Sequence, residues 1–275
     1  MSRESLGQFP GIQWISGLAA AGLIASSAEA GTIGITISST AELRDGSLAV
    51  AVGLENTGDE AAFSVTATLR FLEGEARGQT QTALGPDRTL QDSLQLPAGD
   101  LSQGRWPYVV AVDYTDANEY PFQALHVATF EIGSPLPAKM AVSKFESRGI
   151  AGTGTVSLLV KNLSGAQQKI HVGVLVPDSL EASTPGEDLS LDPWEEKSWN
   201  VELTNRTALP GSRYPVFVAV EYEDGAGHQT IVAQNAVEIL ASDSSWLTSS
   251  RSIWIGAGVA GLLLIGGLAL WARRR

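Results

Sequence analysis

Acidic residues gather near the ends of two similar segments, where their oxygens could bind a calcium ion. The first group is Asp113 and Asp116, and the second is Glu221, Glu223 and Asp224. Calcium takes roughly six to eight oxygen ligands from several loop positions. The D-x-D-x-D-G order of a calcium loop is absent, and the second group also fits an ordinary hairpin turn. We therefore predict no metal site and keep calcium at these hairpin carboxylates as an alternative.

The other residue types give no pattern typical of catalysis. His126, His171 and His228 are far apart along the chain, and there is no cysteine to join them at a zinc ion. No G-x-S-x-G nucleophile motif occurs, and the glycines around Thr153 lack the lysine of a phosphate-binding loop. We predict a protein that is not an enzyme and that uses no cofactor.

Four aromatic side chains are the candidate binding residues. Trp106 and Tyr214 each precede a proline at the start of a predicted strand, where an amphipathic ring can pack at a sheet edge or stack on a sugar. Trp194 and Trp199 flank residues 195–197 and indicate a contact surface in the second half of the chain. Carbohydrate is therefore an alternative ligand, beside a protein partner.

The two similar segments belong to an internal repeat. Residues 105–116, RWPYVVAVDYTD, match residues 213–224, RYPVFVAVEYED, 108 positions later. An apolar segment that runs into an asparagine turn precedes each of them, at Asn56 in the first copy and at Asn162 in the second. This spacing is too long for a solenoid unit and indicates a duplicated globular domain.

Each copy has the pattern of short β-strands. Apolar and polar residues alternate in 63–71 and 171–176, and turn residues separate such segments. Six or seven strands in about 100 residues predict an antiparallel β-sandwich. The sequence GSPLP at 133–137 predicts a stiff connection. We thus expect two domains, 31–133 and 134–240, arranged like beads on a short rod.

In each copy the apolar strand runs into Asn-x-Gly or Asn-x-Ser-Gly, and a segment of the form Gly-x-Arg-Tyr-Pro-x-x-Val-x-Val-x-Tyr-x-Asp comes later. This arrangement resembles the bacterial and archaeal Ig-like modules of the CARDB and NEW3 type, over residues 46–132 and 152–239. The resemblance implies an all-β fold of two tandem Ig-like antiparallel β-sandwich domains. It also implies a spacer, adhesion or interaction role, and it carries over no catalytic residue.

The two ends of the chain predict export and anchoring. An uncharged apolar run at 14–25 is followed by Ala28-Glu29-Ala30, which predicts a signal peptide over 1–30. A Ser-rich linker, 241–252, leads to the uncharged segment 253–271, which is long enough to be one C-terminal transmembrane helix. The anchor residues are the interfacial Trp254 and Trp271 and, in the basic cytoplasmic end 272–275, Arg273, Arg274 and Arg275. Removal of this helix by a sorting enzyme of the exosortase kind is an alternative fate.

Composition narrows the set of partners. The chain has 30 acidic against 18 basic residues, a net charge of −12. Nucleic acid and anionic lipid surfaces both require basic patches, so this balance argues against them. With no cysteine, no disulfide can close a domain, and stability must come from apolar burial.

Together these features predict a single-pass type I protein of a bacterial cell membrane, with its N-terminal domains periplasmic or extracellular. The predicted function is a protein-interaction or structural module of the cell envelope, for example an accessory subunit of a membrane complex. The alternatives are a cell-surface adhesion or carbohydrate-binding protein and a periplasmic pilus-type assembly chaperone. The sequence leaves the partner and the oligomeric state open.

Overall fold

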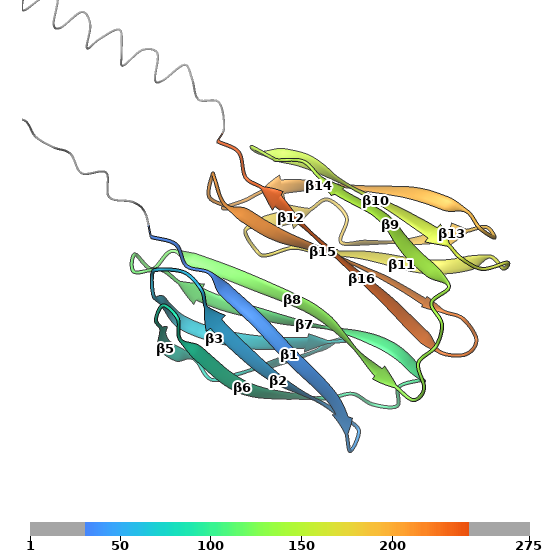
Figure 1. Cartoon of the computed structure of the whole chain (residues 1–275), viewed down its shortest axis with the longest axis horizontal. Coiled ribbons are helices and arrows are strands. Elements are labelled where there is room, and N and C mark those ends of the chain that lie inside the picture. The colour runs from blue at the N-terminus through green and yellow to red at the C-terminus, as the bar shows by residue number, and fades with distance from the viewer. Residues whose placement is uncertain (1–30, 242–275) are drawn as a thin grey trace, which may run out of the picture. The chain divides into compact units, whose positions relative to one another are not determined.

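The computed structural model describes residues 31–241, and every regular element in this range is a β-strand (Figure 1). The prediction of an all-β fold is confirmed for this range. No helix among residues 31–241 has the length and hydropathy needed to cross a membrane. The predicted signal peptide, most of the linker, the transmembrane helix and the basic end lie outside the described residues.

The N-terminal half comprises β1 to β8 and forms two sheets. The first sheet has the order β1 (Ile35–Arg44), β2 (Ser47–Asn56), β6 (Thr89–Pro97). In the second, β7 (Gly104–Thr115) lies between β8 (Pro121–Ile132) and β3 (Ala62–Phe71), and β3 also pairs with β4 (Gly74–Arg77) and β5 (Gln81–Leu84). One apolar core lies between these two sheets.

The C-terminal half repeats this plan with β9 to β16. One sheet has the order β12 (Leu180–Ala182), β14 (Glu196–Asn205), β10 (Thr153–Asn162), β9 (Met140–Ser147). The other has the order β13 (Gly186–Leu191), β11 (Gln168–Leu175), β15 (Arg213–Glu223), β16 (His228–Glu238). A second apolar core fills the space between them.

Side-chain alternation along the strands builds these cores. Every second residue of β2 is buried, from Leu48 to Leu54, because successive side chains of a strand point to opposite faces. The matching valines of β7 and β15, which the sequence predicts to be core residues, are fully buried: Val110, Val112, Val218 and Val220.

A buried asparagine fixes the end of the second strand in each half. Asn56 has no exposed surface, and its Nδ2 donates to the carbonyl oxygens of Glu60 (2.7 Å) and Leu84 (2.9 Å). Its Oδ1 accepts the backbone N–H of Gly58 at 3.1 Å. One amide thus satisfies backbone groups of three segments, which would otherwise be buried without partners.

Asn162 has the same role in the C-terminal half. Its Nδ2 donates to the carbonyl oxygens of Ala166 (2.8 Å) and Asp192 (2.9 Å), and its Oδ1 accepts the N–H of Ser164 (2.9 Å). The repeat seen in the sequence is therefore also a repeat of hydrogen-bond geometry. The resemblance to Ig-like modules implies an architectural asparagine corner, and these bonds give that corner its physical basis.

The two halves meet through one parallel backbone pairing, which we call the junction, between Gly104 of β7 and His228 of β16. The N–H of His228 donates to the carbonyl oxygen of Gln103 at 3.0 Å. A Cβ at Gly104 would collide with the carbonyl oxygen of His228, and one at Gly227 with that of Gln103. Both glycines also have positive φ, so the close approach depends on the absence of a side chain.

The arrangement of beads on a rod is wrong, because the halves also share an apolar cluster. This cluster lies on the outer faces of the strands around β7 and β15, opposite the two cores, and its buried members are Ala111, Leu125, Val127 and Phe217. These residues would face water if only a stiff linker joined the halves. Their burial makes the two halves a single packed unit.

We predict that Asn162→Ala destabilises the protein by about 2–4 kcal/mol, because several buried backbone groups lose their partners. Denaturant unfolding followed by circular dichroism measures the change. Asn200→Ala is the matched control, since Asn200 is exposed and bonds only the Ser157 hydroxyl by its side chain in the described structure. Equal losses for the two variants would refute the architectural role of Asn162.

Candidate binding cleft between the two halves

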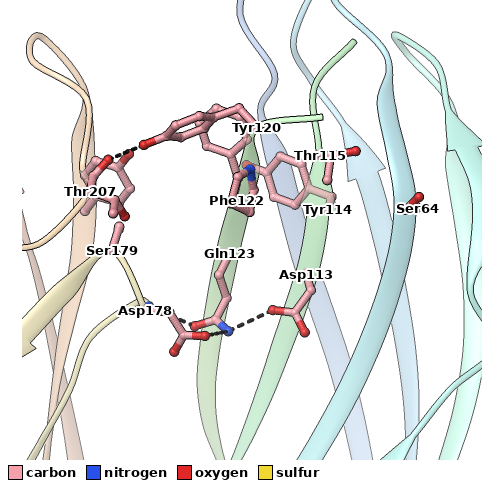
Figure 2. Close-up of a pocket in the computed structure, with 12 residues that line it drawn as sticks. Ser64, Asp113, Tyr114, Thr115, Tyr120, Phe122, Gln123, Asp178, Ser179 and Thr207 are labelled. Carbon is pink, nitrogen blue, oxygen red and sulfur yellow. Dashed lines mark hydrogen bonds between the residues drawn. The ribbon is translucent and has the colours of Figure 1, made fainter. Parts of the chain in front are cut away.

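A cleft of about 260 Å³ opens where the two halves separate at the end of the shared cluster. Its N-terminal wall consists of the end of β7, the start of β8 and the turn between them, with Asp113, Tyr114, Tyr120, Phe122 and Gln123. Its C-terminal wall consists of loop residues Asp178, Ser179 and Thr207 and of Tyr214 in β15. Figure 2 shows side chains of the two walls facing one another.

Aromatic rings form the upper part of the cleft in Figure 2. The Tyr114 and Phe122 rings stack, with centroids 5.6 Å apart and planes 18° from parallel. The Tyr120 ring lies 5.1 Å from that of Phe122 and is tilted by 59°. Tyr and Phe rings in such an array offer π faces and apolar edges to a ligand.

Below the rings lies an arrangement that we call the carboxylate clip, made of Asp113, Gln123 and Asp178. The Nε2 of Gln123 donates to Oδ1 of Asp113 at 2.8 Å and to Oδ2 of Asp178 at 3.0 Å. Its Oε1 accepts the backbone N–H of Asp178 at 3.2 Å. One amide therefore holds two carboxylates, one from each half, on either side of it.

The walls are fastened across the cleft at a second point. The hydroxyl of Tyr120 donates to the carbonyl oxygen of Thr207 at 2.6 Å. The turn that carries Tyr120 is itself ordered by Asp116, whose Oδ1 accepts the N–H of Asn118 (2.8 Å) and of Tyr120 (2.9 Å). These backbone bonds lower the pKa of Asp116, the bond from Tyr120 most.

One polar atom of the cleft is left over. The Oγ of Ser179 is buried and has no hydrogen-bond partner within residues 31–241. A buried hydroxyl without a partner costs free energy.

Burial keeps the Tyr114 phenol neutral. It raises the pKa of Tyr114 to about 12, and the neighbouring Tyr214 adds to this shift. The Tyr114 ring therefore remains an uncharged phenol at any physiological pH, with its electron-rich face intact.

At the opposite end of the contact between the halves, the junction, side chains of the two halves touch. There the Trp106 ring stacks on His228, with centroids 3.8 Å apart and planes 14° from parallel. Nδ1 of His228 lies 2.9 Å from Oε1 of Glu223, and Nε2 lies 3.2 Å from Oε2 of Glu221. Thr230, two residues along β16, donates to the carbonyl oxygen of Arg105 at 3.0 Å. Hydrogen bonds and stacking thus hold the two halves together at this end.

The structure separates the four aromatic candidates of the sequence. Tyr214 lines the cleft, and Trp106 is covered on one face by His228. Trp199 is a core residue, 5% exposed, and its Nε1 donates to Glu187. Trp194 is 64% exposed at a turn, where its φ of 62° is unusual for a bulky side chain. The four do not form one surface.

The hairpin carboxylates do not converge either. Asp113 belongs to the carboxylate clip, and Glu221 and Glu223 flank His228. Asp224 pairs with Lys139 at 3.1 Å. Within residues 31–241 no group of three or more acidic, histidine or cysteine side chains has the geometry to hold a metal ion.

Sequence reasoning missed Gln123, Asp178, Ser179, Tyr120 and Phe122. Asp178 and Ser179 reach the cleft only through tertiary packing, so no local pattern marks them. The sequence did contain one signal of a contact between the halves, because residues 109–112 and 216–220 are unbroken apolar runs. Strands buried on both faces have such runs, and a strand wetted on one face does not.

A scan against protein-family models finds no match, and no curated protein matches the chain. Among solved structures, trypsin-activated α2-macroglobulin from Escherichia coli is 12% identical, with a TM-score of 0.30 over 75% of this chain and 18% of that one. Red sea bream transglutaminase is 11% identical, with a TM-score of 0.27 over 75% of this chain and 31% of that one. The chain thus spans less than a third of either protein. It is β-rich and distantly resembles their β-domains, with no family assigned.

We predict that His228 makes stability depend on pH. Burial lowers the pKa of His228, but hydrogen bonds to Glu221 and Glu223 and their negative charge outweigh it, so the net shift is upward. The stabilisation is then complete below the unfolded pKa of about 6.5 and is lost as the pH rises through the higher folded pKa.

Denaturant unfolding of the wild type and His228→Gln from pH 5.5 to 8.5 tests this prediction. The difference in unfolding free energy between the two proteins should shrink as the pH rises. His171→Gln is the control, since His171 is exposed and its ring bonds Asp188, away from the junction. A difference that grows with pH would contradict the assignment.

Proposed function

We propose that this chain is a non-enzymatic interaction module of the bacterial cell envelope and that the cleft is its contact site for a protein partner. The observation that carries the proposal is the lining of the cleft. Four aromatic rings, two carboxylates and the buried Ser179 hydroxyl come together there from both halves. Concave sites with an apolar surface and a few fixed polar groups are where proteins bind ligands.

The rest of the proposal concerns how the module is displayed. We take the two halves to be tandem Ig-like sandwiches, exported by the signal at 1–30 and anchored by the helix at 253–271. The buried asparagine in each half and the two cores support two units of one type. A single-pass anchor would keep the cleft at the membrane surface, where a subunit of an envelope complex could meet its partner.

The size of the cleft favours a protein partner over an extended sugar chain. At about 260 Å³ it lies slightly below the ~300 Å³ at which small-molecule pockets begin. One inserted side chain of a partner fits such a volume, and the surrounding surface can supply the remaining contacts. Recognition of a single sugar unit is the second candidate, favoured by the rings of Tyr120 and Phe122.

We predict that blocking the cleft releases the partner. The native chain has no cysteine, so Thr115→Cys places a single thiol in the cleft lining, and a bulky maleimide attached there fills it. In pull-downs from gently solubilised membranes, a partner retained by the unlabelled variant should be lost after labelling.

Ser190→Cys is the control for this experiment, because Ser190 is exposed on β13 outside the cleft lining. Labelling there should leave the partner bound. A partner retained equally by both labelled proteins would show that the cleft is not the contact site.

We also predict that chain recovered from membranes keeps its C-terminus. If the helix at 253–271 is a permanent anchor, intact-mass analysis gives a chain that runs from Gly31 to Arg275. A mass that lacks the helix and the arginines would contradict anchoring and indicate cleavage by a sorting enzyme.

A further inference from the structure

We infer that the cleft binds a cation, the protonated amine or guanidinium of a basic side chain on the partner. This inference rests on the proposed function, since it names the chemistry by which the same cleft selects its partner. Four properties of the lining support it, namely the fully used donors of Gln123, the free carboxylate oxygens, the charge and the rings.

The first property is that Gln123 has no N–H donor left for a ligand. Both hydrogens of its Nε2 go to carboxylates, and its Oε1 accepts the N–H of Asp178. An amide side chain has only two N–H donors to offer. Gln123 is therefore a positioning residue that holds Asp113 and Asp178 at a fixed spacing.

The second property is that the atoms left over are acceptors. Each carboxylate uses one oxygen on Gln123, so Oδ2 of Asp113 and Oδ1 of Asp178 have no side-chain or loop-backbone partner within residues 31–241. These free carboxylate oxygens favour a ligand that donates several hydrogen bonds, as ammonium and guanidinium groups do.

The third property is uncompensated negative charge. No Lys or Arg in the described part of the chain forms an ion pair with Asp113 or Asp178, although seven other carboxylates there pair with a Lys or Arg. Gln123 holds these two carboxylates at the cleft, where Asp178 is exposed and open to a ligand. Charges left unpaired in a recess favour a ligand of opposite sign.

The fourth property is that aromatic rings in the cleft also favour a cationic ligand. The cleft presents the faces and edges of Tyr114, Tyr120 and Phe122 beside the carboxylate clip. A cation close to such faces gains cation–π attraction, and the aliphatic stem of Lys or Arg packs well on aromatic rings. A neutral sugar would gain the stacking and hydrogen bonds to the free carboxylate oxygens, but it would lack the charge attraction.

Saturation-transfer NMR on the full chain in detergent tests the inference with small probes. Nα-acetyl-arginine amide is the cationic probe, and Nα-acetyl-citrulline amide is its neutral analogue of nearly the same shape. We expect the arginine probe to bind at least about tenfold more tightly than the citrulline probe, because only it has the charge that the clip and the rings attract.

Asp178→Asn tests the clip itself, because asparagine keeps an oxygen for Gln123 and removes only the charge. Binding of the arginine probe should weaken about five- to tenfold, and binding of the citrulline probe should not change. Asp188→Asn is the matched control, since it removes the same charge from an exposed position on β13. Its affinity should equal that of the wild type.

Two outcomes would overturn the inference. Equal binding of arginine and citrulline probes would show that charge is not selected, and binding of methyl glucoside in place of either would identify a sugar site. The proposed function is judged separately by the thiol-blocking experiment, which does not depend on charge. The labelled Thr115→Cys variant could lose the partner while the arginine and citrulline probes bind equally. The cleft would then still be the contact site, and only the preference for a cation would be rejected.

Discussion

Burial of the outer faces of β7 and β15 against each other is the constraint on which the rest of the described structure depends. Each strand has one face in the core of its own half and the other in the shared cluster with Leu125 and Phe217. Fully burying an apolar side chain contributes about 1.5–3 kcal/mol, so a few such residues can fix the halves together. The glycines at 104 and 227 then allow the backbones to meet at the junction.

The cleft follows from this packing. Twisted sheets can touch along only part of their length, and where they part the gap needs polar groups that water or a ligand can reach. Here the gap is spanned by two sets of bonds, one from Tyr120 to Thr207 and one through Gln123 to Asp178. Neither half has the complete set of groups, so the site exists only in the assembled pair.

The sequence predicts the fold of each half more fully than it predicts the residues of the cleft. Alternation, turn residues and the asparagine corners are local signals, and they located β2, β3, β7 and β15 correctly. They missed β1 and β9, edge strands whose outer residues are largely polar. The cleft depends on which residues meet across the halves, and spacing along the chain does not encode that. Nothing in the local sequence distinguishes Asp178 from other loop residues. Its place in the cleft depends on folding, which brings the Nε2 of Gln123 to 3.0 Å from its Oδ2.

Matching residues of the repeat take corresponding places in the two halves. Asp113 pairs with Gln123 across β7 and β8 as Glu221 pairs with Thr230 across β15 and β16, and Trp106 matches Tyr214. Two identical subunits joined about a two-fold axis would use the same residues at both ends of their contact. In a homodimer both ends of the contact would have to be alike. Two copies joined in one chain can differ in sequence, so one end of their contact is the hydrogen-bonded junction and the other is the cleft.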